Sequence, residues 1–401
     1  MTESAIQLPT PGETVLQTYE RIRERGPIVP IEFPGGVAVW AAVSHRAASE
    51  LLAGDGTLFS KNAKNCPALH DGTIPADWPM RTLTDMDHML NKDGEDHRRL
   101  RKTISKAFTP ARVAALEPRI QRITNELIDA FPLDNGPVDL VSAFNTPLPV
   151  RVICELFGVP EDEQELIRDW TTTLVSHTST AEQMQTAMQA MTVYLAELIE
   201  RKRRTPGDDL TTALLEPDGS GLTTDEMVSM LWLAIAAGHE TTVHLLGNAI
   251  ITLCTHPDQL TKAQAEDRWS DVVEEVLRYR SSVFTVNLRY PLQDVTIAGV
   301  DIPAGALITW YGGVGRDPEH YPDADTFDID HDHRDQLAFG RGPHVCLGAP
   351  LARLEIRIAL ATLFSRFPEL SLACDPEQLP YPPQFMTSGP LCLPVHLKPI
   401  A

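Results

Sequence analysis

The sequence has no apolar run long enough to span a bilayer, for which about 20 consecutive apolar residues are needed. Its first residues, Met1 to Ser4, lack the basic stretch and the following apolar stretch of a secretory signal. The six cysteines are scattered without paired spacing, which disfavours a disulfide framework and fits a reducing compartment. We therefore expect a cytoplasmic protein with no membrane segment.

Positive charge is also scarce, because 34 Lys and Arg face 55 Asp and Glu for a net charge of -21. This balance argues against a partner that is a nucleic acid. No internal repeat, linker or low-complexity tract is visible. The 401 residues are 43% hydrophobic, enough for a large core, and the 32 prolines predict many breaks between short elements.

Helical periodicity dominates the chain. It covers residues 13–25, 113–131, 141–156, 161–175 and 181–203, and the longest helix is predicted over 224–253, capped by Thr223 or Thr224. Extended segments are predicted over residues 28–33 and 37–43 as a hairpin, and over 283–290, 295–302 and 307–312 as a small mixed sheet. Residues 62–92 show no sustained period, and both a binding loop and a disordered surface loop remain open for them.

One cysteine occupies a distinctive turn, Phe339–Gly348, whose sequence reads Phe-Gly-x-Gly-x-His-x-Cys-x-Gly. Glycines permit backbone angles that side chains resist, and an apolar-striped helix is predicted over 351–364 directly afterwards. Cys346 therefore lies just ahead of a helix N-terminus, where free amides and the helix dipole favour a thiolate. A buried inert thiol and a zinc site with His344 are the weaker readings, the latter because no second Cys or His pair stands nearby.

This turn resembles the haem-binding loop of the cytochrome P-450 monooxygenases. The resemblance implies a mainly α fold with a small β region, forming a triangular prism around a buried haem b, in one domain over residues 1–401. It implies that Cys346 is the axial iron ligand, flanked by cofactor-binding Phe339, Gly340, His344 and Gly348.

Two further motifs fit the same resemblance. His97 and Arg101 stand one turn apart on a predicted helix, and with His344 and Arg289 they match the family's haem propionate partners. In the long helix, Ala237 and Gly238 match the segment beside the iron, and Glu240 and Thr241 match the acid-alcohol pair that delivers protons to bound dioxygen. A structural alternative is that Thr241 bonds the carbonyl of Ala237 and bends the helix.

Glu275 and Arg278 stand at i, i+3 and match the family's Glu-x-x-Arg pair behind the cysteine loop. The chain departs from the family where His331 replaces the expected arginine partner and Gln336 replaces a histidine. In the family the segment after the Glu-x-x-Arg helix lines the substrate pocket, which makes Phe284, Thr285, Val286 and Asn287 candidates. Met386 and Thr387 in a later turn, and Met89 and Leu90 in the segment 62–92, are further candidates.

The resemblance covers nearly the whole chain and implies a monooxygenase that hydroxylates or epoxidises an apolar small molecule with dioxygen. The substrate is expected to be a polyketide, terpenoid, steroid or cyclic peptide of secondary metabolism. Ferredoxin and ferredoxin reductase are the expected electron donors, docking on a basic stripe of Arg98, Lys102 and Lys106, and the enzyme is expected to be a monomer. Oxidative coupling or dehydrogenation remains an alternative, as does a non-catalytic haem sensor, which would not require Glu240 and Thr241.

Overall fold

The computed structural model describes residues 5–10, 13–106, 108–132, 136–175, 179–215, 221–285, 288–382 and 386–397. The chain forms two compact units, each assembled from three segments. The first comprises Met1–Arg98, Glu274–Cys346 and Pro383–Ser388, and the second comprises Arg99–Val273, Leu347–Pro382 and Gly389–Ala401. The single domain expected from the sequence stays a prediction.

The first unit contains a four-stranded mixed sheet in the order β1-β2-β3-β9. Its strands are β1 (Ile6–Gln7), β2 (Ile28–Phe33), β3 (Val37–Ala42) and β9 (Ile308–Trp310). The predicted hairpin is confirmed, since β2 and β3 pair antiparallel from Ile28 opposite Ala42 to Phe33 opposite Val37. Its turn uses Gly35 and Gly36 at φ +88° and +76°, angles that favour glycine.

Residues 62–92 pack into the core of this unit through several short helices. These are η1 (Ala63–Asn65), η2 (Pro67–Leu69), α3 (Arg81–Asp85) and η3 (Met89–Asn91). Cys66, Leu69, Ile74 and Trp78 join the same hydrophobic cluster as the sheet. The indole nitrogen of Trp78 donates to the carbonyl oxygen of Pro34 at 2.8 Å. The described part of this segment is therefore ordered by burial, against the disordered alternative.

Among the described residues of the strand predicted over 283–290, only Tyr290 belongs to a strand, β6 (Tyr290–Pro291), which pairs antiparallel with β4 (Phe59–Ser60). The prediction is therefore wrong for the described residues before Tyr290. Val283 and Arg289 make isolated bridges. The prediction over 295–302 resolves into the hairpin of β7 (Val295–Ile297) and β8 (Val300–Ile302).

The remaining helices lie mostly in the second unit. Their bounds are α4 (Gly94–Ser105), α5 (Pro110–Ala115), α6 (Glu117–Asp129), α7 (Pro147–Phe157), α8 (Gln164–Val175), α9 (Ala181–Arg204), α10 (Leu210–Leu215), α11 (Thr224–Thr255), α12 (Pro257–Glu266), α13 (Trp269–Tyr279) and α14 (Ala349–Arg366); α1 (Val15–Arg23) and α2 (His45–Ala53) belong to the first unit. The single helix predicted over 113–131 is two helices, because Pro118 lacks an amide donor and sits at the start of α6. A three-stranded sheet of β10 (Ser371–Leu372), β11 (Pro394–His396) and β5 (Val138–Asp139) completes this unit.

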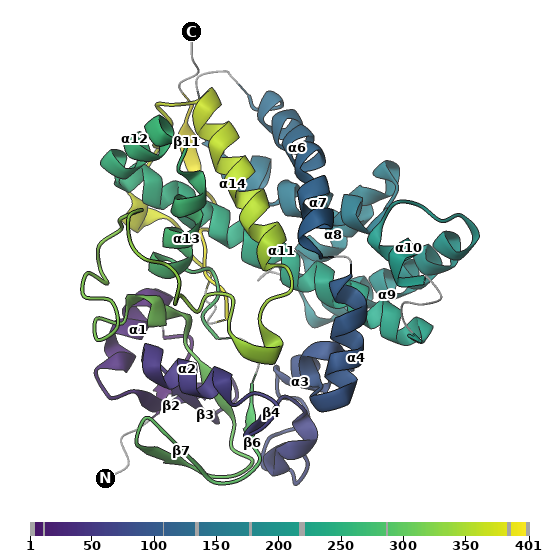
Figure 1. The fold of residues 1–401 in the computed structure, drawn as a ribbon, viewed down its shortest axis with the longest axis vertical. Helices are drawn as coiled ribbons and strands as arrows, with labels where there is room; N and C mark the ends of the chain where they lie inside the picture. Colours follow the sequence, from purple (N-terminus) through teal and green to yellow (C-terminus); the bar gives the residue numbers. More distant parts are fainter. Residues whose placement is uncertain are drawn as a thin grey trace. The chain divides into compact units, whose positions relative to one another are not determined.

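The long helix α11 begins as predicted, since Thr223 and Glu226 form a reciprocal capping box. It packs against α7, α9 and α14, and α14 also packs against α6 (Figure 1). Gly247 of α11 leaves room for Pro390, because a Cβ at this position would approach the Pro390 ring to 2.9 Å. Every residue from Thr242 to Leu253 is buried, so the carboxyl-terminal half of α11 forms part of the core.

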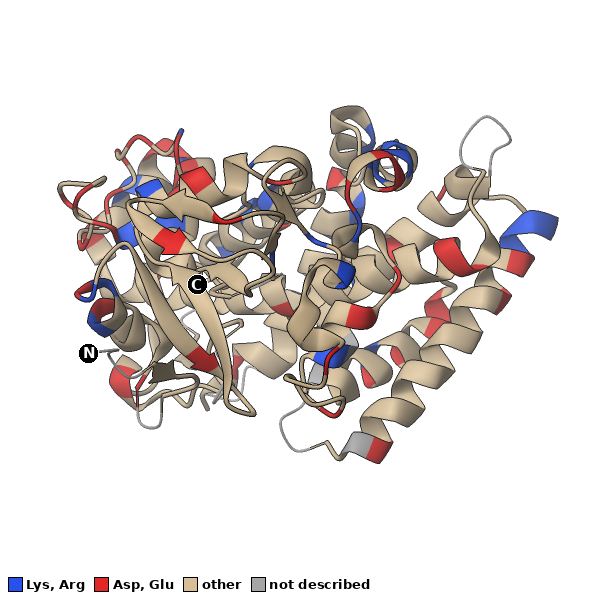
Figure 2. Cartoon of the chain, turned by 90° about the horizontal axis from the view of Figure 1, so that it is seen from below, with Lys and Arg blue, Asp and Glu red and all other residues tan. Residues whose placement is uncertain are grey.

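Charged residues lie on helices and loops alike, with Asp and Glu interspersed among Lys and Arg (Figure 2). Within the described ranges, no helix is both long enough and apolar enough to cross a membrane.

Candidate functional site

Cys346 ends a tight turn in the first unit that backbone hydrogen bonds hold in place. Its amide donates to the carbonyl oxygen of Phe339 at 2.8 Å, and the amide of Val345 donates to Gly342 at 3.1 Å. Gly340 and Gly342 have φ of +70° and +77°, the left-handed angles that the sequence predicted for these positions. The turn leaves Cys346 exposed, so its thiol is accessible to a ligand.

Cys346 directly precedes α14, which starts at Ala349 with Pro350 in its first turn. The N-cap residue is Gly348, which has no side chain to satisfy the first amides of the helix. The helix is 18 residues long, so its dipole and open amides favour negative charge at this end. This arrangement suits a thiolate better than a neutral thiol.

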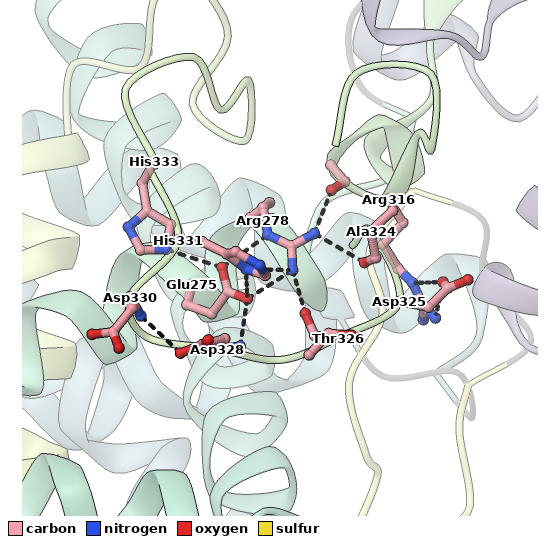
Figure 3. Close-up of polar contacts among 11 residues, drawn as sticks. Glu275, Arg278, Arg316, Ala324, Asp325, Thr326, Asp328, Asp330, His331 and His333 are labelled. Carbon is pink, nitrogen blue, oxygen red and sulfur yellow. Dashed lines mark hydrogen bonds and ion pairs between the residues drawn. The ribbon is translucent and has the colours of Figure 1, made fainter. Parts of the chain in front are cut away.

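Glu275 and Arg278 form a buried ion pair in the first unit (Figure 3). Arg278 donates from Nε and Nη2 to the two carboxylate oxygens of Glu275, at 2.8 and 2.7 Å. It also donates to carbonyl oxygens of Gly315, Ala324 and Thr326 at 2.7 to 3.0 Å, and its Nη2 lies 3.4 Å from Nδ1 of His331. The pair therefore ties helix α13 to the loop that leads toward Cys346.

His331 contacts Glu275 as the sequence predicted, with Nδ1 2.9 Å from Oε1. A second histidine, His333, was missed, and its Nε2 lies 2.9 Å from Oε2. Both rings point at the carboxylate in Figure 3, where two imidazoles thus occupy the place expected for one guanidinium. The available signal in the sequence was the spacing of His331 and His333, which are two residues apart.

Burial disfavours the charged form of Glu275, but hydrogen bonds from Arg278 and His333 outweigh it and lower its pKa to about 2. The amide of Asp328 also donates to this carboxylate, at 3.0 Å. The other departure from the family, Gln336, donates to Glu274 at 3.2 Å and accepts from the amide of Ala338 at 2.7 Å. Gln336 therefore stabilises the approach to the cysteine turn rather than the Glu275 cluster.

The side chains of the predicted propionate partners in the first unit are buried, and two of them lie side by side. The rings of His97 and His344 lie 4.1 Å apart between centroids, tilted by 33°. Arg289 is 3% exposed and makes a bidentate ion pair with Asp55, at 2.6 and 2.8 Å. The sequence did not identify Asp55, because 234 residues separate the two partners along the chain. Arg101 follows His97 by one turn of α4, as predicted, and is partly buried in the second unit.

The polar segment of α11 lies in the second unit. The Thr241 hydroxyl donates to the Ala237 carbonyl at 2.7 Å, which confirms the hydrogen bond of the structural alternative; the bend of the helix stays a prediction. A hydroxyl has one donor, so in this state Thr241 meets a further ligand as an acceptor. Ala237 is exposed and Glu240 is half-buried, in contrast to the buried turns that follow. Gly238 has a packing reason, since a Cβ there would approach Ile153 of α7 to 2.9 Å.

Some of the candidate substrate residues contact one another. The amides of Phe284 and Thr285 donate to the carbonyl of Met386 at 2.8 and 3.3 Å, and Val283 forms a bridge with Thr387. Phe284 is 2% exposed and packs edge-on against Tyr311, so its ring belongs to the core. In η3, Met89 is buried and Leu90 is half-buried. The candidates Val286 and Asn287 lie outside the described residues.

The residues of the first unit fit haem b. An exposed cysteine ahead of a helix provides one soft anionic ligand, and buried Arg289 with the adjacent rings of His97 and His344 provides donors for carboxylates. Among the described residues, no group of three or more His, Cys, Asp and Glu side chains is placed to hold a metal ion. The fold and this donor set define a haem-thiolate protein.

The comparisons with known proteins agree. The family model described as Cytochrome P450 matches residues 150–391. Over 387 residues the chain is 40% identical to cytochrome P450 monooxygenase PikC of Streptomyces venezuelae, covering 95% of this chain and 90% of PikC. It is 38% identical over 397 residues to 2-hydroxy-5-methyl-1-naphthoate 7-hydroxylase of Streptomyces carzinostaticus, covering 97% and 95%. The solved structure of CYP154C4 from Streptomyces sp. W2061 superposes with a TM-score of 0.92 at 36% identity, covering both chains fully (100%).

The chain therefore belongs to the cytochrome P450 family, of the bacterial type. Its cofactor is haem b, and it is a P450 monooxygenase with the fold that the sequence predicted.

Proposed function

We propose that this monooxygenase hydroxylates or epoxidises an apolar small molecule of secondary metabolism, with Cys346 as the iron ligand. The observation that carries the proposal is the exposed Cys346 held by the Gly340 and Gly342 turn ahead of α14. Relatives named as a monooxygenase and a hydroxylase support the reaction type. The substrate belongs to one of the four classes expected from the sequence.

Bound haem supplies an iron centre that activates dioxygen, and a thiolate ligand favours O–O cleavage. The roles of the protein's own residues follow from their positions. The Glu275 cluster holds the loop behind Cys346, which fixes where the sulfur stands. His97, His344, Arg289 and Arg101 bind the propionates.

On α11, Glu240 and Thr241 move protons toward the reacting oxygen. The hydroxyl of Thr241 is anchored to the carbonyl of Ala237 at 2.7 Å, so its oxygen has a defined position from which to accept a hydrogen bond. Glu240 is half-buried, which leaves its carboxylate able to exchange protons with solvent. A pure haem sensor would not need this pair.

Two electrons come from a ferredoxin reduced by a ferredoxin reductase. The basic stripe of Arg98, Lys102 and Lys106 is exposed on and just after α4, and Arg98 also pairs with Glu95 at 2.7 Å. Local positive charge can attract an acidic partner although the chain is acidic overall, because long-range repulsion is screened beyond about 8 Å at physiological salt. The monomeric state and the cytoplasmic location stay predictions.

The test is the absorption spectrum of the reduced carbon monoxide complex. We expect wild type to show the red-shifted thiolate band and Cys346→Ser to lose it, because a hydroxyl is a poor anionic ligand at neutral pH. Cys374→Ser, a partly exposed cysteine elsewhere, is the matched control and should keep the band. A Cys346→Ser protein that retained the band would refute the assignment.

Product analysis under ¹⁸O₂ then tests the reaction type. Incorporation of one labelled atom supports hydroxylation or epoxidation, whereas a coupled or desaturated product without label supports the alternative. A ligand screen that follows the iron spin state would identify the substrate class.

A further inference from the structure

Helix α2 contacts the segment that leads into the cysteine turn, residues 339–346, at three points in the first unit. At the start of the helix, Nε2 of His45 lies 2.8 Å from the carbonyl oxygen of Asp335. In its middle, alanine and leucine side chains share a buried cluster with Leu337. At its end, a Cβ on Gly342 would approach the carbonyl oxygen of Leu52 to 3.0 Å. The position of the cysteine turn therefore depends on α2.

His45 makes the polar contact among these three. Its side chain is buried, and its Nε2 must carry the hydrogen, because a carbonyl oxygen can only accept. The carboxylate of Asp335 also faces the turn, 3.5 Å from Nη2 of Arg341. This ion pair is exposed and contributes little by itself. The hydrogen bond from His45 therefore fixes the backbone at Asp335 more firmly than the ion pair does.

A second imidazole stacks on His45. The rings of His45 and His320 are nearly parallel, with 3.5 Å between their centroids and 6° between their planes. The ring of Tyr321 meets His45 edge-on at 5.7 Å. His320 is exposed, so it can exchange a proton with solvent. Since two positive charges repel each other at this distance, the stack disfavours a proton on both rings.

The surroundings of His45 favour its neutral form. Burial lowers the pKa of His45 below its usual value, and the charges of His320 and Arg341 act in the same direction. The carbonyl of Asp335 and the carboxylate of Asp317, which accepts from the His45 amide at 2.7 Å, oppose this shift. His45 is also the first residue of α2, where the helix dipole disfavours a cation.

The other elements packed against α2 add one charged residue to this set. Strands β3 and β7 contain no charged residue. The helix η6 (Gly312–Arg316) contributes Arg316, which is paired with Asp325 at 2.6 Å. The titratable and charged groups that face His45 are therefore Asp317, His320, Tyr321, Asp335 and Arg341.

We propose that His45 is a positioning residue for the cysteine turn, and that a proton taken up by the stacked pair of His45 and His320 loosens this turn. The inference rests on the proposed role of Cys346 as the iron ligand. A histidine that is protonated less readily in the folded chain than in the unfolded chain stabilises the fold above its unfolded pKa of about 6.5, and this stability decreases as pH falls below that value. The thiolate is therefore held less securely in mild acid.

The test follows the rate at which the reduced carbon monoxide complex loses its red-shifted thiolate band, at pH values between 8 and 5.5. His45→Phe keeps a ring for the stack but has no donor for Asp335, so we expect roughly fivefold faster loss at pH 8. His45→Gln places an amide donor near the position of Nε2 and does not titrate. It should restore the wild-type rate at pH 8 and should be accelerated less by acid than wild type.

Two further variants complete the test. His320→Phe keeps the ring face but removes the charge, so it should lose the band at the wild-type rate at pH 8 and should also be accelerated less by acid. His70→Gln is the matched control, because His70 is an exposed histidine of the same unit whose Nε2 lies 3.0 Å from the carbonyl oxygen of Ala63. It should follow wild type at every pH.

Equal rates for wild type and His45→Phe at pH 8 would overturn the proposal, and so would the same acid acceleration in wild type, His45→Gln and His320→Phe. If His45→Phe does not fold, the profiles of His45→Gln and His320→Phe decide alone. A wild type without the thiolate band at pH 8 refutes the assignment of Cys346, and this inference fails with it. A wild type that shows the band but shares its pH profile with His45→Gln refutes this inference alone.

Discussion

Glu275→Gln should destabilise the protein strongly, because the Glu275 carboxylate accepts hydrogen bonds from the loop that precedes Cys346. Its side chain is fully buried and accepts from Arg278, His331, His333 and the amide of Asp328. A glutamine has one acceptor oxygen instead of two and no charge. The substitution therefore removes the carboxylate that faces the buried guanidinium of Arg278.

Two estimates of the magnitude agree. Lowering the pKa of Glu275 from 4.5 to about 2 corresponds to about 3 kcal/mol of folding stability at neutral pH. Removing one partner of a buried ion pair typically costs about 3–5 kcal/mol. We therefore expect Glu275→Gln to lower the free energy of unfolding by about 3–5 kcal/mol at pH 7.

The sign of the pH dependence follows from the lowered pKa. Stability from an acid whose pKa is depressed in the folded state is present above its unfolded pKa and is lost as pH falls toward the folded value. For Glu275 this window runs from 4.5 down to about 2. The facing groups are Arg278 from the same helix and the imidazoles of His331 and His333 from the loop, while the nearby carboxylate of Asp332 is paired with Arg334.

The assay is urea unfolding followed by circular dichroism, with haem absorbance recorded in parallel, at several pH values between 7 and 3. The difference between wild type and Glu275→Gln should be largest at pH 7 and should shrink as pH falls below 4.5. Glu274→Gln removes a charge from the adjacent position, which contacts Gln336, and should cost far less. A difference between Glu275→Gln and wild type that stays constant over this range would show that the carboxylate's ionisation does not supply the stability.

Two further outcomes are expected. Thr241→Ala should leave haem binding nearly intact but divert electrons to peroxide, because a positioned proton relay accelerates proton transfer by roughly 10²–10⁴-fold. Thr241→Ser should restore the amount of product formed per electron. An unchanged amount in the alanine variant would mean that Thr241 only makes its structural hydrogen bond with Ala237. Lys102→Glu should slow reduction by a ferredoxin, since Lys102 is exposed on α4, while peroxide-supported turnover stays unchanged. Added salt should slow the reduction of wild type. A loss of turnover through both routes would indicate damage to the haem site instead.

Part of this protein's structure could be predicted from its sequence. The Gly340 and Gly342 turn, the capped start of α11 and the β2-β3 hairpin depend on residues close together along the chain, so their backbone preferences appear directly in the sequence. The wrong strand over 283–290 shows the limit of such patterns. Its β-branched and aromatic residues resemble a strand, but the amides of Phe284 and Thr285 bond to the single carbonyl of Met386, about a hundred residues away, instead of to a neighbouring strand.

Only the tertiary structure decided which distant partners meet. His333 and Asp55 carried no motif of their own, because their roles depend on contacts made across the fold. The sequence determined the ligand turn and the family, since the family is defined by residue types at short, fixed spacing. The tertiary structure determined how each buried charge is compensated, because a buried charge requires a nearby partner in space, wherever along the chain that partner lies.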